Sequence, residues 1–169
     1  MLHICIPSPF GSLTIFEDCG ALVALEWGRA PESGITETPL LRAARRQLDA
    51  YFDGALQRFT LPLRPAGTPF RNGVWSRLAA IPYGHTETYG TLARDLGTGP
   101  RALAAACAAN PLPIVVPCHR VVASGGALGG YSGGDGTDTK VALLRLEGVL
   151  GWETAMLADA SRPLAEDRR

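Results

Sequence analysis

The stretch from residue 110 to 122, Asn-Pro-Leu-Pro-Ile-Val-Val-Pro-Cys-His-Arg-Val-Val, restricts the fold more than any other part of the chain. Its three prolines fix φ and lack a backbone N–H, so the segment before Cys118 resists helix formation. Ile114, Val115 and Val116 are β-branched and apolar, which favours buried extended backbone. We therefore expect a thiol on a rigid, non-helical segment beside a buried wall of side chains.

An imidazole directly follows this thiol. The thiolate form of cysteine is the nucleophile, and a base within reach can generate it. Adjacent residues in extended backbone point to opposite sides, so His119 can serve Cys118 only through a tight turn or a bridging water. Spacing alone leaves a second interpretation open, in which Cys118 is a small, inert core residue.

The residues around the thiol favour the first interpretation. The pattern Asn-Pro-x-Pro-Ile-x-x-Pro-Cys-His-Arg-Val, followed by Gly-Tyr-Ser-Gly-Gly at 130–134, resembles the O6-alkylguanine-DNA alkyltransferases. These are the methylated-DNA–protein-cysteine methyltransferases. The resemblance is tight over residues 68–150 and looser over 1–67, and the residues after Trp152 add nothing to it.

The charge balance adds little to this resemblance. The chain carries 16 Lys and Arg against 16 Asp and Glu, so no overall attraction to nucleic acid is expected. Residues 69–150 hold seven basic and five acidic residues, a net charge of +2, and this mild excess supports DNA binding only weakly.

The spacing of the cysteines and the lengths of the apolar runs indicate the compartment in which the protein works. The four cysteines, at positions 5, 19, 107 and 118, form no Cys-x-x-Cys pair, and the N-terminus lacks the pattern of a signal peptide. No apolar run approaches the ~18 residues of a membrane span. We expect a cytoplasmic monomer in a reducing compartment, with no membrane partner.

The first part of the chain predicts a small α/β domain in which a helix packs across a sheet. Three short segments between turn residues read as strands, at 2–6, 12–17 and 21–27. Thr38 followed by proline is typical of a helix start, and Gly54 is typical of a helix end. The resemblance implies a ribonuclease-H-like domain over residues 1–67.

Three prolines and a glycine between residues 62 and 69 mark the expected domain boundary. A second domain is expected over 68–155 and a polar tail over 156–169. The start of the second domain carries Phe70, Val74 and Leu78, which are spaced as on one face of a helix.

Two short helices, Tyr89 to Leu96 and Arg101 to Ala109, flank a tight turn and predict a helix-turn-helix. The resemblance implies a winged-helix-like domain that binds DNA and carries the alkyl acceptor.

The second helix of this pair has almost no side chains able to reach base edges in a major groove. On its residues alone, it could equally be an alanine-rich core helix. In the family this helix lies in the minor groove, and Arg101 resembles the arginine that intercalates there. The turn before Arg101 is shorter than in the family pattern, which leaves Arg94 as the nearest alternative. The DNA-binding residues implied by the resemblance are Arg101, Ala102, Ala105, Thr88 and Tyr89.

An alkyl group on a base oxygen cannot be reached inside the DNA stack, so the nucleotide must turn out into a pocket. The resemblance makes Cys118 the alkyl acceptor and places His119 and Glu147 behind it in a Cys–water–His–Glu arrangement. It also makes Asn110 a brace of the active-site turn and Tyr89 a proton donor to the leaving guanine. On the residues alone, Glu147 could be a surface carboxylate and Asn110 a turn residue.

The glycine-rich run from 129 to 134 predicts a flexible loop. The resemblance makes this loop the lid of the pocket, with Tyr131 packing on the base and the Ser132 backbone near O6. It also implies that the carbonyls of Cys118 and Val121 meet the guanine amine. The implied substrate-binding residues are Tyr131, Ser132, Val121, Pro113 and Cys107, of which Cys107 stands where a larger apolar residue is expected.

The resemblance implies DNA repair by direct, single-turnover transfer of an alkyl group from O6-alkylguanine in double-stranded DNA, after nucleotide flipping. O4-alkylthymine is left open as a second substrate. No cofactor is expected. His3 and Cys5 share a strand face, but two ligands do not make a structural metal site, so no metal is expected either.

Two other functions stay open. The first is a non-catalytic protein that recognises alkylated DNA, and relatives of that kind usually have tryptophan in place of the cysteine. The second is a cysteine hydrolase that uses Cys118 and His119, although catalytic pairs in such enzymes are usually distant in sequence.

Overall fold

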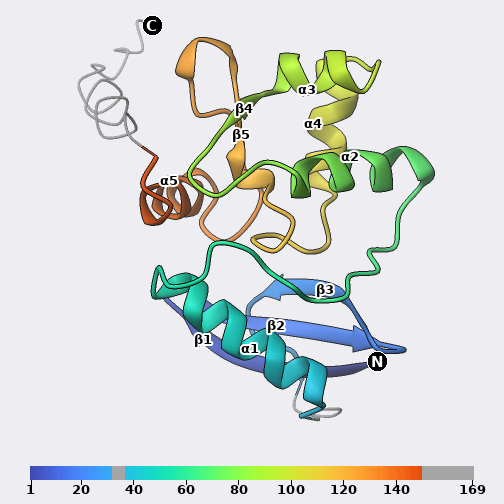
Figure 1. The fold of residues 1–169 in the computed structure, drawn as a ribbon, viewed down its shortest axis with the longest axis vertical. Helices are drawn as coiled ribbons and strands as arrows, with labels where there is room; N and C mark the ends of the chain where they lie inside the picture. The colour runs from blue at the N-terminus through green and yellow to red at the C-terminus, as the bar shows by residue number, and fades with distance from the viewer. Residues whose placement is uncertain (32–36, 150–169) are drawn as a thin grey trace, which may run out of the picture.

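The computed structural model describes residues 1–31 and 37–149. The expected tail at 156–169 and the last residues of the expected domain over 68–155 lie outside these ranges. In Figure 1 a sheet with one helix forms the lower part of the molecule, and a group of helices forms the upper part. No helix within the described ranges is long and apolar enough to cross a membrane.

An antiparallel sheet in the order β1-β2-β3 forms the first part of the chain. Its strands are β1 (Leu2–Ser8), β2 (Gly11–Asp18) and β3 (Ala21–Trp27). Ile4 and Ile6 of β1 lie in the core because alternate side chains of a strand share a face. The helix α1 (Pro39–Phe52) packs against β1 and β2. The prediction of a small sheet with a helix across it is therefore confirmed.

The helix α1 begins and ends at the residues that the sequence indicates. The Thr38 hydroxyl accepts a hydrogen bond from the Leu41 N–H at 3.0 Å, and a proline occupies the first helical position. Gly54 follows the helix with φ of +71°, a conformation that glycine adopts without strain. The buried face of the helix consists of Leu41, Ala44, Leu48 and Tyr51.

The segment after α1 returns along the free edge of the sheet. The Leu22 N–H donates to the Pro62 carbonyl at 2.8 Å, and the Arg64 N–H donates to the Leu22 carbonyl at 2.8 Å. The expected boundary at 62–69 is therefore extended backbone that pairs with β3 before the next helix begins. The division into domains at residue 67 stays a prediction.

The second part of the chain combines helices with a short pair of parallel strands. Its helices are α2 (Pro69–Ala79), α3 (Tyr89–Asp95), α4 (Pro100–Ala108) and α5 (Thr137–Leu146). Because α3 and α4 pack together around a tight turn, the expected helix-turn-helix is present. The strand β4 (Glu87–Thr88) pairs with β5 (Val121–Val122), which ties the start of α3 to the residues just after Cys118.

The buried face of α2 differs from the face that the helical spacing in the sequence predicts. Val74 and Leu78 are buried as their spacing suggests, but Phe70 is 43% exposed. Trp75 takes the buried place instead, and its indole N–H donates to the Ala106 carbonyl of α4 at 2.9 Å. The face of α2 that meets α4 is therefore set by Val74, Trp75 and Leu78, and Phe70 lies outside it.

Candidate active site

The segment that carries Cys118 is rigid and buried but not extended. Residues 113–115 form a turn in which Ile114 has φ of +73°, and the Val116 N–H donates to the Leu112 carbonyl at 2.8 Å. The expectation of an extended segment over 114–116 is therefore wrong. A left-handed conformation is costly for a β-branched residue, so the surrounding contacts must hold Ile114 in place.

Asn110 supplies several of these contacts. Its amide Nδ2 donates to the Val116 carbonyl at 2.8 Å, and its Oδ1 accepts from the Leu112 N–H at 3.0 Å. The same Nδ2 lies 3.3 Å from the Cys118 sulfur, in position to donate to it. One side chain thus closes the turn and points a donor at the thiol, which agrees with the bracing role implied for Asn110.

A tight turn brings His119 behind the thiol. Residues Cys118–Arg120 form one turn of 3-10 helix, and both Cys118 and His119 are buried. The His119 Nε2 lies 2.7 Å from the Glu147 Oε1. Because a carboxylate only accepts, Nε2 carries the proton of the neutral imidazole, and Nδ1 is left as an acceptor. This Nδ1 is buried and has no hydrogen-bond partner among the described residues.

Glu147 caps the C-terminal end of α5 and is the most heavily hydrogen-bonded carboxylate of the site. Arg120 donates to it twice, from Nε to Oε2 at 2.9 Å and from Nη2 to Oε1 at 3.0 Å. The Tyr51 hydroxyl donates to Oε1 at 2.7 Å. Burial opposes ionisation, but the hydrogen bonds from His119 and Arg120 outweigh it and lower the pKa of Glu147 to about 2.

Electrostatics keeps the imidazole neutral at rest. Burial lowers the pKa of His119, while its hydrogen bond to Glu147 acts in the opposite direction. Arg120 supplies the positive charge that balances Glu147, so His119 need not be protonated to do so. A neutral imidazole with a free Nδ1 is a base that is ready to accept a proton.

The Cys118 thiol is protonated at rest and lies beside a buried lysine. Burial raises the pKa of Cys118, although the Asn110 amide and the Lys140 charge act to lower it. Lys140 is fully buried, and its Nζ donates to the Val121 carbonyl at 2.6 Å and to the Gly130 carbonyl at 3.1 Å. Burial lowers the pKa of Lys140 to about 8, so its ammonium form persists at neutral pH.

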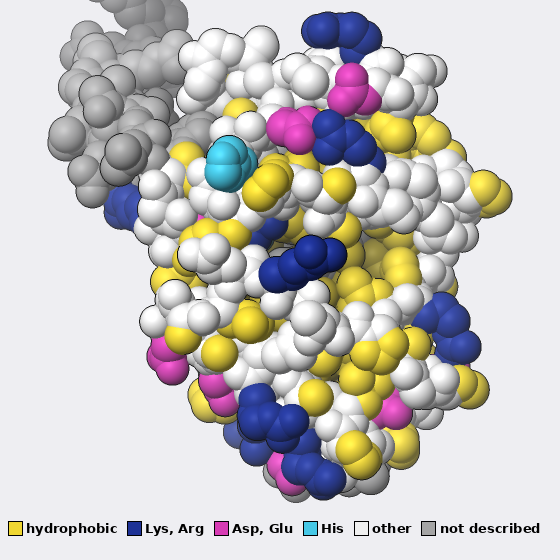
Figure 2. Space-filling view, in the orientation of Figure 1, with side chains coloured by type: hydrophobic (Ala, Val, Ile, Leu, Met, Phe, Trp, Pro, Cys, Tyr) yellow, Lys and Arg dark blue, Asp and Glu magenta, His cyan; other side chains and the backbone are white. Residues whose placement is uncertain are grey.

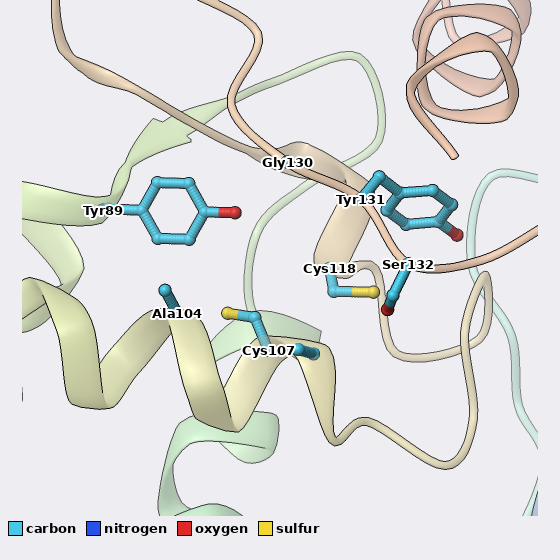
Figure 3. Close-up of a pocket in the computed structure, with 8 residues that line it drawn as sticks. Tyr89, Ala104, Cys107, Cys118, Gly130, Tyr131 and Ser132 are labelled. Atoms are coloured by element: carbon cyan, nitrogen blue, oxygen red, sulfur yellow. The ribbon is translucent and has the colours of Figure 1, made fainter.

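A pocket of about 370 Å³ opens in front of the thiol. Figure 3 shows Tyr89 directing its hydroxyl into the space between α4 and the loop at Gly130–Ser132. Burial raises the pKa of Tyr89 to about 12, so its phenol keeps its proton at neutral pH. The lining residues are Tyr89, Ala104, Cys107, Ala108, Cys118, Gly130, Tyr131 and Ser132.

A neighbouring pocket of about 410 Å³ lies on the β3 side and shares Cys107, Cys118, Tyr131 and Ser132 with the first. Pro113 lines this second pocket. Val121 is buried and lines neither pocket, and its carbonyl accepts a hydrogen bond from Lys140. The other expected substrate-binding residues line the pockets next to Cys118, while the contacts of all five with a base stay a prediction.

Three of the residues expected to touch DNA lie on the exposed face of α4, whereas the other two, Thr88 and Tyr89, are half-buried at the start of α3. Arg101, Ala102 and Ala105 are exposed on α4, whereas Leu103 and Ala106 turn inward. The Thr88 hydroxyl accepts from the Thr91 N–H at 3.1 Å and so caps α3. On the face shown in Figure 2, basic side chains are spread over both halves, with acidic ones among them.

The candidate metal ligands near the N-terminus have other partners. The His3 ring lies 3.1 Å from the Pro31 carbonyl, and the Cys5 sulfur lies 3.3 Å from the Thr14 hydroxyl. Within residues 1–31 and 37–149, no group of three His, Cys, Asp or Glu side chains is placed to hold a metal ion.

The sequence does not reveal the roles of Tyr51, Arg120 and Lys140. In sequence, Arg120 reads only as part of the Cys-His-Arg motif and Lys140 only as one of several charges. In sequence, Tyr51 reads only as an aromatic residue near the end of the first expected helix, with no indication of its partner. Tyr51 and Glu147 are 96 residues apart in the sequence, so no local pattern reveals that they pair.

Comparisons with known proteins cover both parts of the chain. Residues 69–149 match the family described as 6-O-methylguanine DNA methyltransferase, DNA binding domain, and residues 1–65 match its ribonuclease-like domain. A methylated-DNA–protein-cysteine methyltransferase of Methanosarcina acetivorans is 39% identical over 88% of this chain and 99% of its own length. One of Mycobacterium leprae is 43% identical over 87% of this chain and 93% of its own.

Solved structures give the same result. Mycobacterium tuberculosis OGT in complex with DNA superposes with a TM-score of 0.76 at 38% identity, covering 88% of this chain and 93% of that chain. An O6-methylguanine DNA methyltransferase from Methanococcus jannaschii superposes with a TM-score of 0.63 at 26% identity, covering 98% and 99%.

Lys140→Met should make the Cys118 thiol harder to ionise, because the variant loses the positive charge that favours the thiolate. We expect labelling of Cys118 by iodoacetamide, followed by peptide mass spectrometry, to slow about 10-fold at neutral pH. The difference should narrow above about pH 8, where Lys140 itself loses its proton.

Arg145→Met is the matched control, since it removes one positive charge from the exposed side of the same helix. Equal slowing in both variants would mean that overall charge, and not the position of Lys140, sets the reactivity of the thiol.

Proposed function

The chain belongs to the 6-O-methylguanine DNA methyltransferase family, and we propose that Cys118 is the residue through which it acts. The protein is a methylated-DNA–protein-cysteine methyltransferase that repairs DNA by direct alkyl transfer, with double-stranded DNA as its partner. The observation that supports Cys118 is its position. Cys118 lines a pocket, its sulfur lies 3.3 Å from a donor on Asn110, and the adjacent His119 is paired with the buried Glu147.

The proposed reaction needs only groups of this chain and the damaged base. The Cys118 proton passes to Nδ1 of His119 through a bridging water, and Glu147 stabilises the imidazolium that forms. The sulfur then attacks the alkyl carbon. The S–C bond forms as the C–O6 bond breaks, the electron pair stays on guanine O6, and the base takes up one proton.

Tyr89 is the proposed donor of that proton. Its phenol is protonated at neutral pH and points into the pocket, as a general acid must. The product is a thioether on Cys118, which has no evident route back to the thiol. Each molecule should therefore act once and, we propose, as a monomer.

Nucleotide flipping supplies the substrate in this proposal. The pocket volume of about 370 Å³ is within the usual range of roughly 300–1,000 Å³ for ligand sites. Arg101 would occupy the space left in the stack, and the exposed alanines of α4 would allow close approach to the minor groove. Tyr131, Ser132, Val121, Pro113 and Cys107 would surround the base and its alkyl group.

We also propose that the protein works in the cytoplasm. All four cysteines are free, as a reducing compartment favours. A non-catalytic role in recognising alkylated DNA is less favoured, because the thiol and its complete supporting network would then have no use.

Cys118→Ala should abolish alkyl transfer and leave binding to alkylated DNA largely intact. The test is incubation with a duplex that contains O6-methylguanine, followed by intact-mass measurement and peptide mapping. Wild type should gain one methyl group on Cys118, and the variant should gain none. A methyl group found on Cys107 in the variant would defeat the assignment.

Arg101→Ala should impair repair of duplex DNA more than repair of a single strand, because only a stacked base needs the gap to be held open. We expect the duplex-to-single-strand ratio of transfer rates, at fixed salt, to fall about 10-fold or more. Arg94→Ala removes the same charge from the same motif and should leave that ratio unchanged. The opposite pattern would assign the wedge to Arg94.

A further inference from the structure

The N-terminal part of the chain reaches into the active site through Tyr51. This tyrosine lies in the last turn of α1 and is only 1% exposed. Its hydroxyl donates to Glu147 Oε1 at 2.7 Å and lies 3.5 Å from His119 Nε2. The phenol therefore contacts both members of the pair that activates Cys118.

A second contact from the same part of the chain ends beside the thiol. The Leu25 N–H of β3 donates to the Pro111 carbonyl at 2.8 Å. Pro111 directly follows Asn110, whose amide closes the turn before Cys118. The sheet and α1 thus contact the active site at both of its supports, the Asn110 turn and the Glu147 carboxylate.

We propose that Tyr51 is a positioning residue for alkyl transfer, through which the N-terminal sheet and helix fix the Glu147 carboxylate and so limit the basicity of His119. This inference rests on the proposed function of Cys118 and His119.

The sharing of one oxygen atom explains how the phenol would act. Glu147 Oε1 accepts from His119 Nε2, from the Tyr51 hydroxyl and from Arg120 Nη2. Each donor disperses part of the negative charge on that oxygen. Without the Tyr51 donor, more of the negative charge acts on His119 and raises the pKa of its imidazole. A smaller fraction of His119 is then in the neutral, basic form at low pH.

The direction of the hydrogen bond is fixed by the charges present. Burial raises the pKa of Tyr51, and the charge of Glu147 raises it further, so the phenol stays protonated and donates. Tyr51→Phe removes this donor and keeps the ring, which packs against Phe52, Phe59 and Tyr83. The substitution therefore separates the hydrogen bond from the packing.

Tyr83→Phe is a matched control. The Tyr83 hydroxyl donates to the Leu146 carbonyl at 3.0 Å, next to Glu147 in the chain but not to its carboxylate. Both variants lose one phenolic donor at the end of α5. Among residues 1–31 and 37–149, the titratable or charged side chains close to His119 and its partner carboxylate are Glu147, Arg120, Lys140, Tyr51, Tyr83 and Cys118.

The experiment measures single-turnover methyl transfer from a methylated duplex as a function of pH in the full-length wild type, Tyr51→Phe and Tyr83→Phe. In Tyr51→Phe the acid side of the profile should move to higher pH. Below the wild-type midpoint the rate should fall about 10-fold, the effect of losing one hydrogen bond to a charged group. The pKa of the His119 ring, measured without DNA by nuclear magnetic resonance (NMR) titration, should rise as well.

Tyr83→Phe should follow the wild-type profile. An unchanged profile and titration in Tyr51→Phe, or equal shifts in both variants, would overturn the role of Tyr51. Loss of transfer in wild type itself would instead overturn the proposed function. If Tyr51→Phe does not fold, the wild-type NMR spectrum decides. The Tyr51 hydroxyl proton should exchange slowly with water and lie close to the His119 ring. If no signal from this proton is seen, the proposal is refuted.

Discussion

The buried carboxylate of Glu147 is the group on which the rest of the site depends. A single ionised carboxylate without partners would be costly at this depth, and here it accepts hydrogen bonds from His119, Arg120 and Tyr51. These donors come from the 3-10 turn after Cys118 and from α1. One carboxylate therefore joins the N-terminal helix, the turn that bears Cys118 and the end of α5.

This arrangement separates two requirements of the chemistry. Arg120 balances the charge of Glu147, so His119 stays neutral and its Nδ1 is free to accept a proton. Asn110 and Lys140 point donors or positive charge toward the other side of the site, where they favour the thiolate. The thiol is thus protonated at rest, and the groups that we propose to ionise it are already in place.

The sequence predicts the local features of this protein well. Thr38 caps its helix as expected, because capping depends on one hydroxyl near its own backbone. The grouping of Cys118, His119 and Glu147 was expected only from the family resemblance, because Glu147 lies outside the motif that contains Cys118 and His119. The expectations fail where a specific side-chain contact, near or distant in sequence, decides the outcome. Ile114 adopts a left-handed turn because Asn110 closes it, against the extended preference of a β-branched residue. Tyr51 and Lys140 meet the site only after folding, so no spacing in the sequence reveals them.

The protonation state of His119 in the resting protein tests this account most directly. Histidine labelled with nitrogen-15, with the signals of the three histidines assigned by substitution, reports which ring nitrogen carries a proton. The account predicts, at neutral pH, a neutral ring that is protonated at Nε2 and unprotonated at Nδ1. A ring protonated at both nitrogens, or at Nδ1 alone, would contradict the proposal that His119 is the base that activates Cys118.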